Sequence, residues 1–234
     1  MTHTGISIVG LALLASTACI NSQPSSSAAA AGGKSAPPVA APTTPAPAGK
    51  LFTWDGDKKT SGKGWASCSK KGECDTTIDV DPKGGRAGPG LKFHAEGPDW
   101  MGFGWNWHGW YPEGAGDNIS SYKNLSFWIR VDAKDSANAP DPNSVMTWLS
   151  CSCKEKKEDE RSTTQVKVVD YAKDFADGKW HEVVIPLEVF FKDKGASFDK
   201  TTAWEFDIGT WSNAKKDFDI YVDEIGFDNR TLPK

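Results

Sequence analysis

Short runs in which apolar and polar residues alternate recur along this chain, and glycine, proline, asparagine or aspartate bounds each run. A period of two places the apolar side chains on one face of a β-strand. No long stretch has the period of an amphipathic helix. We therefore predict eight strands, over residues 90–95, 101–107, 124–131, 144–153, 163–169, 180–187, 202–209 and 217–227.

Strands that follow one another without intervening helices bury their apolar faces in two packed antiparallel sheets. The predicted fold class is therefore an all-β, antiparallel two-sheet jelly-roll sandwich. The chain from residue 50 onward, about 185 residues, is long enough for one such domain. The charged run KEKKEDER at 154–161 is predicted as a solvated hairpin loop, with a helical turn as the alternative.

The N-terminus has the pattern of an export signal. Residues 6–15, ISIVGLALLA, form an apolar run that is too short to span a bilayer, which takes about 20 residues. The segment LLASTAC, which ends at Cys19, resembles a bacterial lipoprotein signal, in which Cys19 is lipidated after cleavage. The alternative is an ordinary signal peptide with a chance cysteine.

Both alternatives predict an exported protein, either an outer-membrane or cell-surface lipoprotein held by its lipid alone, or a secreted one. Residues 20–49 contain six prolines and no aromatic residue. Such a segment cannot bury a core, so we predict a disordered tether with an average span of about 30 Å. The predicted organisation is a signal peptide over 1–19, this tether, and a folded domain over 50–234.

The charge of the chain limits its partners. The formal net charge is −4, and residues 1–49 contain one lysine and no acidic residue. The negative charge therefore belongs to the folded part, whereas binding to nucleic acid or to an anionic membrane needs a basic face. We expect a monomer that binds no nucleic acid.

The cysteine pattern agrees with an oxidising compartment. Cys68, Cys74, Cys151 and Cys153 remain when Cys19 is set aside for the lipid, and an even number can form disulfides. A bond within the last pair would close a very small ring, so we favour two cross-links between the first pair and the last pair. A metal site is the alternative, although the spacing matches no common zinc pattern.

Eleven tryptophans, all after residue 50, are an unusual feature of the composition. Aromatic rings either bury a large apolar area or present a flat surface to a ligand. Alternation places Trp105 and Trp107 on one face with Phe103, so we assign both to the core, together with Trp180 and Trp204. The opposite face of that strand carries glycines, which clear space for something to approach.

Several segments follow one another in an order typical of one family. They are LFTWDGDKKTSGKGW (51–65), SYKNLSFW (121–128), WHEVVIPL (180–187) and VDEI (222–225). Their succession resembles the galactose-binding-like β-jelly rolls, in particular family 11 carbohydrate-binding modules and related secreted bacterial lipoproteins. The resemblance implies a sugar site without catalysis on the concave face of a sheet.

The same resemblance implies a structural calcium ion near the ends of the domain. Asp223 in the last strand and Asp55 and Asp57 in WDGD are the matching oxygen ligands, completed by backbone carbonyls. The alternative is that WDGD forms a turn and that Asp223 caps a strand end.

A sugar site needs rings for stacking and polar groups that bind hydroxyls. The outward positions of three strands, with the loop after 107, supply both. The predicted ligand-binding residues are Asn106, His108, Trp110, Tyr111, Trp128, Arg130, Glu205, Asp207 and Trp211. Alternatively, His108 is a hydrogen-bonded residue at a strand end. Arg130 alternatively pairs with Asp207 or Asp132.

We predict that the protein binds a polysaccharide such as β-glucan and is not an enzyme. The segment EFDI (205–208) resembles the start of the catalytic strand of family 16 β-glucanases, but Gly209 occupies the position of the last carboxylate. The acid/base that hydrolysis requires is therefore missing. A structural or protein-binding lipoprotein that kept the fold without binding sugar is the other alternative.

Overall fold

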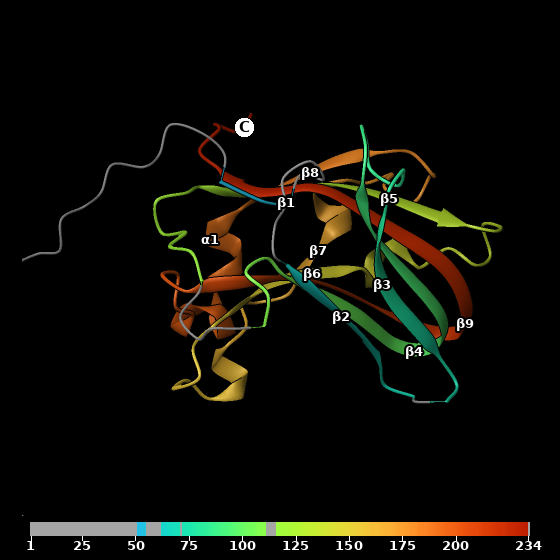
Figure 1. Cartoon of the computed structure of the whole chain (residues 1–234), viewed down its shortest axis with the longest axis horizontal. Coiled ribbons are helices and arrows are strands. Elements are labelled where there is room, and N and C mark those ends of the chain that lie inside the picture. Colours follow the sequence, from blue (N-terminus) through green and yellow to red (C-terminus); the bar gives the residue numbers. More distant parts are fainter. Residues whose placement is uncertain (1–50, 55–61, 71, 111–115, 234) are drawn as a thin grey trace, which may run out of the picture. The chain divides into compact units, whose positions relative to one another are not determined.

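The computed structural model describes residues 51–54, 62–70, 72–110 and 116–233 (Figure 1). Its strands are β1 (Leu51–Trp54), β2 (Lys63–Cys68), β3 (Asp75–Asp81), β4 (Gly90–Asn106), β5 (Asn124–Ala133), β6 (Met146–Cys151), β7 (Val166–Lys167), β8 (His181–Pro186) and β9 (Ala203–Asp228). Its helical segments are α1 (Leu187–Phe190) and the 3-10 turns η1 (Pro142–Ser144), η2 (Glu158–Glu160), η3 (Val168–Asp170) and η4 (Asp193–Ser197). None of these described helices has the length and apolarity needed to cross a membrane.

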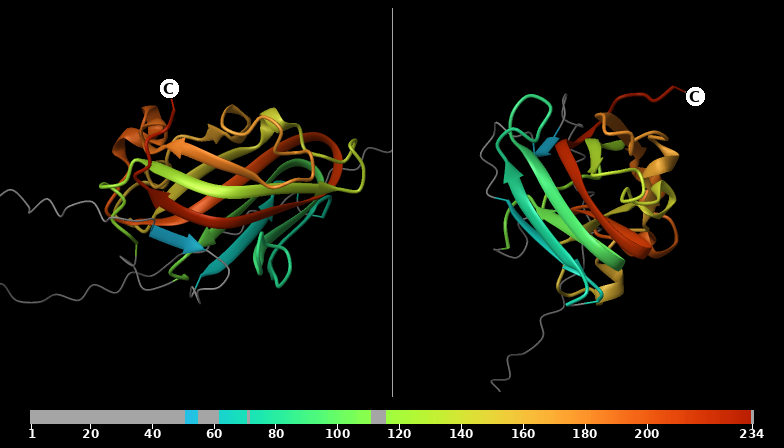
Figure 2. Two further views of the ribbon diagram at one scale, coloured as in Figure 1. Left: turned by 90° about the horizontal axis from the view of Figure 1, so that it is seen from above. Right: turned by 90° about the vertical axis from the view of Figure 1, so that its right-hand side faces the viewer.

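The two long strands β4 and β9 pair antiparallel from Leu91 opposite Val222 to Asn106 opposite Glu205. The first half of β9 also pairs with β6, and the second half of β4 pairs with β2. The second half of β9 pairs with β5 and β1, and the first half of β4 pairs with β3. Figures 1 and 2 show that β4 and β9 curve, so that these two groups of strands form two facing layers.

We call the group with β2, β6 and β7 layer A, and the group with β1, β3, β5 and β8 layer B. β4 passes from layer B to layer A at residues 97–99, where its register with β9 is interrupted. Gly97 has a φ of 135° there, in a region that favours glycine. A Cβ atom on Gly97 would lie 2.4 Å from Cβ of Cys74. A glycine is therefore required where the strand changes layer.

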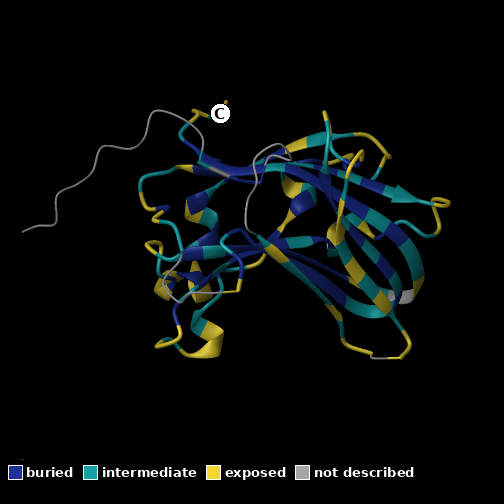
Figure 3. Cartoon of the chain, in the orientation of Figure 1, coloured by how far each residue is buried: buried dark blue, intermediate teal, exposed yellow. Residues whose placement is uncertain are grey.

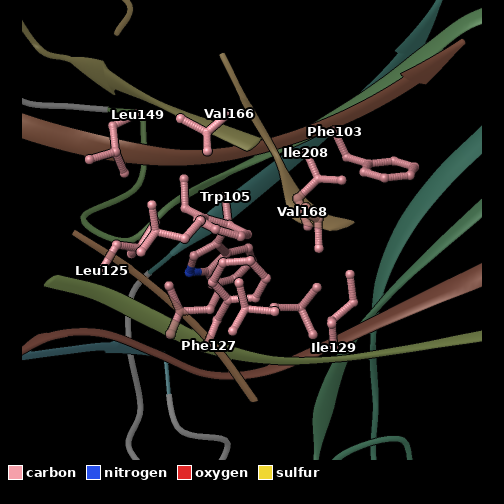
Figure 4. Close-up of a cluster of buried hydrophobic side chains, with 14 of the residues drawn as sticks. Phe103, Trp105, Leu125, Phe127, Ile129, Leu149, Val166, Val168 and Ile208 are labelled. Atoms are coloured by element: carbon pink, nitrogen blue, oxygen red, sulfur yellow. The ribbon is translucent and has the colours of Figure 1, made fainter. Parts of the chain in front are cut away.

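The core lies between the inner faces of the two layers. Phe93 of layer B stacks on Phe103 of layer A with ring centroids 4.2 Å apart. Phe127 of β5 meets Phe206 of β9 edge to face, with centroids 5.0 Å apart. Figure 3 shows how the buried positions follow the strands, and Figure 4 shows side chains from both layers pointing toward one another. The aromatic contacts therefore hold the layers face to face.

The predicted all-β antiparallel sandwich is confirmed, but two of its strands, β4 and β9, are much longer than predicted. The predicted strands 90–95 and 101–107 are both parts of β4, and 202–209 and 217–227 are both parts of β9. The residues between these predicted strands have the composition of turns. In the structure the β4–β9 pairing nevertheless continues beyond the register shift between Gly97 and Asp99. Of the predicted strand 163–169, only the two residues of β7 are extended, and η3 follows.

Strands β1, β2 and β3 were missed by the sequence analysis. The runs KGWASC and DTTIDVD in β2 and β3 contain few large apolar residues, so their alternation is weak. The predicted loop at 154–161 is confirmed, and it contains the 3-10 turn η2.

The predicted disulfide connectivity is wrong. Cys68 is bonded to Cys74, and Cys151 is bonded to Cys153, which also removes all four from the alternative metal site. Cys68 ends β2 and Cys151 ends β6, with β4 and β9 between those strands. Adjacent strands are about 4.8 Å apart, so the predicted pairs lie well beyond the roughly 7 Å between Cα atoms that a disulfide can span.

Replacement of a core ring tests the contact between the layers. Phe127 is fully buried, and its truncation leaves a cavity, so we expect Phe127→Ala to lower the free energy of unfolding by about 3–5 kcal/mol. Val80 is 46% exposed, and Val80→Ala is the control, with an expected loss below about 1 kcal/mol. Guanidinium unfolding of both variants provides the measurement, and equal losses would contradict this account of the core.

Candidate functional site

The outer face of layer A has a strip of bare backbone along its middle. Gly102 and Gly104 of β4 pair with Gly209 and Asp207 of β9. Because successive side chains on a strand point to opposite faces, the residues between these glycines face the core. The missing side chains are therefore confined to the outer face, where the three glycines form a floor.

Tryptophan rings from neighbouring strands lie on this floor. A Cβ atom on Gly104 would lie 2.2 Å from Nε1 of Trp65, and one on Gly102 would lie 2.4 Å from Cζ2 of Trp100. A larger residue at either position would displace the ring above it. Trp65 and Trp100 are both half-buried, so each ring keeps part of its surface open.

Two more tryptophans complete the surface. Cη2 of Trp148 lies 3.0 Å from the Cβ position of Gly209, and Nε1 of Trp100 lies 3.1 Å from it. Trp148 is only 8% exposed, whereas Trp211, opposite Trp100 in the strand pair, is 58% exposed. Trp148 therefore supports the more open rings. We call the following set the tryptophan platform: Trp65, Trp100 and Trp148 on Gly102, Gly104 and Gly209, together with the exposed Trp211.

Buried polar side chains lie on the same face, next to the platform. Asp207 is fully buried, and its Oδ2 accepts a 2.8 Å hydrogen bond from Oγ of Ser150. Burial, and then the charge of Glu205, raise the pKa of Asp207 well above its usual value. Burial also raises the pKa of Glu205, partly offset by the neighbouring Asp207, Trp65 and Asn106 side chains. The pair therefore retains a proton at a pH where exposed carboxyl groups have lost theirs.

This arrangement suits an extended, uncharged ligand with flat faces. From Glu205 to Trp211 the outer face of β9 extends about 20 Å at roughly 3.4 Å per residue. Open indole faces can stack on apolar ring faces, and the partly exposed Ser150 offers a hydroxyl group beside them. Sugars combine flat apolar faces with hydroxyl groups, so the platform matches their chemistry.

Residues 52–229 match the protein family described as carbohydrate binding domain 30. The chain belongs to this family. A solved family 30 module from a cellulosomal cellulase of Clostridium thermocellum has 14% sequence identity and a TM-score of 0.56, and the match covers 78% of this chain and 99% of that one. The predicted resemblance to carbohydrate-binding jelly rolls is therefore confirmed.

Two other solved structures share the fold of this family 30 protein. A family 11 module from Clostridium thermocellum, in complex with a β-1,3-1,4-mixed-linked tetrasaccharide, has 12% identity and a TM-score of 0.51, over 79% of this chain and 98% of that one. A β-1,2-glucanase from Parabacteroides distasonis has 16% identity and a TM-score of 0.51, over 79% of this chain but 25% of the glucanase. No curated protein sequence matches the chain at a significant level.

The structure places four of the predicted binding residues on one face. They are Asn106, Glu205, Asp207 and Trp211, on the outer face of layer A. Asn106 is fully buried and lies opposite Glu205 in the strand pair. Tyr111, also predicted to bind, lies outside the described residues.

His108, Trp128 and Arg130 are not brought to the platform of this family 30 protein. Nε2 of His108 lies 2.9 Å from a carboxylate oxygen of Asp117 beyond the end of β4, which agrees with the strand-end alternative. Trp128 and Arg130 lie on β5, which belongs to layer B. The guanidinium of Arg86 covers the Trp128 ring at 3.6 Å from its centroid.

Arg130 makes one of the two ion pairs that the sequence suggested. Its Nε lies 3.1 Å from Oδ1 of Asp132, whereas Asp207 lies in the other layer. Trp105 and Trp107 are core residues, as predicted, but Trp180 is partly exposed and was wrongly assigned. Trp180 precedes β8, and the guanidinium of Arg130 lies 5.1 Å from its ring centroid.

The predicted core position of Trp204 is also wrong, because the strand pairing changes there. The register of β6 against β9 shifts between Ser150 and Cys151, opposite the start of β9. Trp204 is partly exposed, and its Nε1 donates a 3.0 Å hydrogen bond to the carbonyl of Gly109. Its ring meets Trp110 edge to face, with centroids 6.3 Å apart.

Sequence reasoning missed the three rings that lie on the glycine floor. The alternation in MTWLSC (146–151) places Trp148 on the same face as Ser150, so the outward position of Trp148 could have been predicted from the sequence. Trp65 could not be assigned because β2 was not predicted, and Trp100 falls beside the irregularity in β4. The glycines correctly predicted that a group approaches the backbone closely. In the structure these groups are indole rings of the same chain.

Of the calcium ligands implied by the family resemblance, only Asp223 lies within the described residues. Oδ2 and Oδ1 of Asp223 accept 2.8 Å hydrogen bonds from the backbone N–H groups of Arg86 and Glu224. Asp55 and Asp57 lie outside the described residues. Within the described ranges, no three His, Cys, Asp or Glu side chains are grouped to hold a metal ion. These residues do not by themselves fit calcium, and the site stays a prediction.

The acid pair predicts a pH-dependent effect on stability. The pKa of Asp207 is higher in the folded protein than in the unfolded chain, so its protonated form stabilises the fold at low pH. This stabilisation is lost as the pH rises from about 4, the unfolded value. We expect the melting temperature of Asp207→Asn, relative to the unsubstituted protein, to rise between pH 4 and pH 8.

Asp217 provides a control of opposite sign. Its hydrogen bond with Lys134 lowers the pKa of Asp217, so its contribution is present above the unfolded pKa and is lost as the pH falls. Asp217→Asn should therefore melt slightly below the unsubstituted protein at pH 7 and approach it at pH 3, a small effect because the pair is at the surface. A pH-independent difference for Asp207→Asn would refute the raised pKa.

Proposed function

We propose that this protein binds β-glucan chains without cleaving them and that the tryptophan platform is the binding surface. The observation that carries the proposal is the set of indoles laid on a floor of glycines, away from the core. Glycine in a strand interior weakens the strand, so a purely structural face would more readily carry ordinary side chains. Open rings beside buried polar groups are what an uncharged sugar chain requires.

Membership of the carbohydrate binding domain 30 family supports the sugar as ligand. The choice of β-glucan is supported by two structural matches, a module in complex with a mixed-linked tetrasaccharide and a β-1,2-glucanase. Their sequence identities are low, so they guide the choice of probe only.

The acid pair does not have the properties of a glycosidase pair. Retaining glycosidases place one ionised and one protonated carboxyl group about 5–5.5 Å apart around the scissile bond. Asp207 is fully buried and Glu205 is 8% exposed. Burial disfavours the ionised form of both, and Gly209 follows where a third carboxylate would stand. We therefore propose binding rather than hydrolysis.

Removal of a platform ring should weaken glucan binding. Trp65 and Trp100 contact the floor and remain partly open. We expect Trp65→Ala and Trp100→Ala each to reduce the affinity for mixed-linked β-1,3-1,4-glucan at least tenfold, or about 1.4 kcal/mol. Isothermal titration and affinity electrophoresis provide the measurement.

Trp180→Ala is the matched control, because that ring is equally partly exposed but lies outside the platform. Its affinity should equal that of the unsubstituted protein. Gly104→Ala keeps every ring but displaces Trp65, so it should lose affinity as Trp65→Ala does. Binding that survives all three platform changes would contradict the proposal, and no binding at all would favour the alternative of a structural surface protein.

We further propose that the module is exported and held by a lipid on Cys19, with residues 20–49 as a tether. The support is the LLASTAC pattern and the proline-rich composition. When the full chain is expressed in a Gram-negative host with labelled palmitate, we expect label in the native protein and none in Cys19→Ala. Cys68→Ser, which removes an internal cysteine, should remain labelled, and equal labelling of native protein and Cys19→Ala would rule out the lipid anchor.

A further inference from the structure

A separate pocket lies at one end of the tryptophan platform. It has a volume of about 290 Å³, and it lies where β4 and β6 end and β9 begins. Its walls include Trp204 at the start of β9, Trp110 from the segment after β4, and Arg161 and Glu158 from the loop after β6. Neither the platform rings nor the glycine floor contributes to it.

The two rings of the pocket form an aromatic corner. Trp110 and Trp204 meet at an interplanar angle of 73°. Trp110 is 44% exposed and Trp204 is partly exposed, so both present ring surface to the cavity. The hydrogen bond from Trp204 to Gly109 fixes the orientation of one ring. A corner of this kind gives a small ring-shaped ligand two apolar walls.

Polar groups also line the pocket. Oγ atoms of Ser150 and Ser162 lie 3.2 Å apart, and both residues line the cavity. Arg161 is held in place because its Nε donates to the carbonyl of Lys156 and its Nη2 donates to the carbonyl of Lys154. Serine hydroxyls and the remaining N–H groups of the Arg161 guanidinium, in one pocket with aromatic rings, suit the hydroxyls of a single sugar.

Ser150 connects the pocket with the platform. Its Oγ donates to Asp207 next to the glycine floor, and the same residue lines the pocket. A sugar in the pocket would therefore lie directly beside a chain bound on the platform. The volume is at the lower limit of the roughly 300–1,000 Å³ of ordinary ligand pockets, which suits one sugar residue and excludes a long segment.

We propose that this pocket is a subsite for one uncharged sugar residue of the glucan bound on the platform. The inference rests on the proposed function. The sugar has two possible sources with the same chemistry, the residue at the end of the chain or a single-sugar side branch. Both are uncharged rings with several hydroxyls, and the two sources differ in the ligand that presents them.

Titration with two probes tests the subsite in the full chain. The first probe is a linear mixed-linked β-1,3-1,4-tetrasaccharide, and the second is a β-1,4-glucan oligosaccharide with single-sugar branches. Trp110→Ala removes an exposed ring, so the variant should fold and melt as the unsubstituted protein does. We expect it to lose at least tenfold in affinity for at least one probe, while Trp180→Ala loses none.

The pattern of losses identifies the source. A loss for the linear probe assigns the pocket to the chain end, and a loss for the branched probe alone assigns it to a branch. Unchanged affinity of Trp110→Ala for both probes, with tight binding by the unsubstituted protein, would overturn the subsite and leave the platform intact. If the unsubstituted protein binds neither probe, the proposed function and the subsite both fail.

Discussion

The antiparallel pairing of β4 with β9 is the constraint on which the rest of the structure depends. Both strands run through both layers, so their register decides which residues face the core and which face outward. A shift by one residue would exchange the two faces, turning Phe103 outward and Gly104 inward. The register of β4 against β9 therefore determines both the composition of the core and the position of the tryptophan platform. Gly97 adds to this constraint because it fixes where β4 changes layer.

The platform shows how a sheet can present rings without burying them in the core. Glycine makes a strand less stable on its own, but here it lets Trp65 and Trp100 rest on the backbone, where their contact area offsets part of that loss. The nearby acid pair is a second unfavourable feature, because the carboxyl group of Asp207 is buried away from water. Two unfavourable features on one face, in a domain with an ordinary core, agree with the proposal that this face binds a ligand.

The fold was predictable because period-two alternation is a local property of the sequence. The continuity of β4 and β9 was not, since the residues around Gly97 have the composition of a turn whether or not the pairing continues beyond it. The candidate site was predictable in part: the glycines and the pair Glu205 and Asp207 lie on strands whose faces could be assigned. The tryptophan rings come from β2, from β6 and from the irregularity in β4. Which of these segments become neighbours depends on the strand order of the sheet, and no local sequence pattern contains that order.

The place of β1 has a mechanical consequence. β1 pairs with the end of β9 over Leu51 to Trp54, while the platform occupies the beginning of β9. A pull along the axis of β1, applied at Leu51, would slide β1 past β9 and load the hydrogen bonds of the pair together. A pull across the strands would instead break such bonds one at a time. The β1–β9 pair therefore meets a pull along β1 in shear.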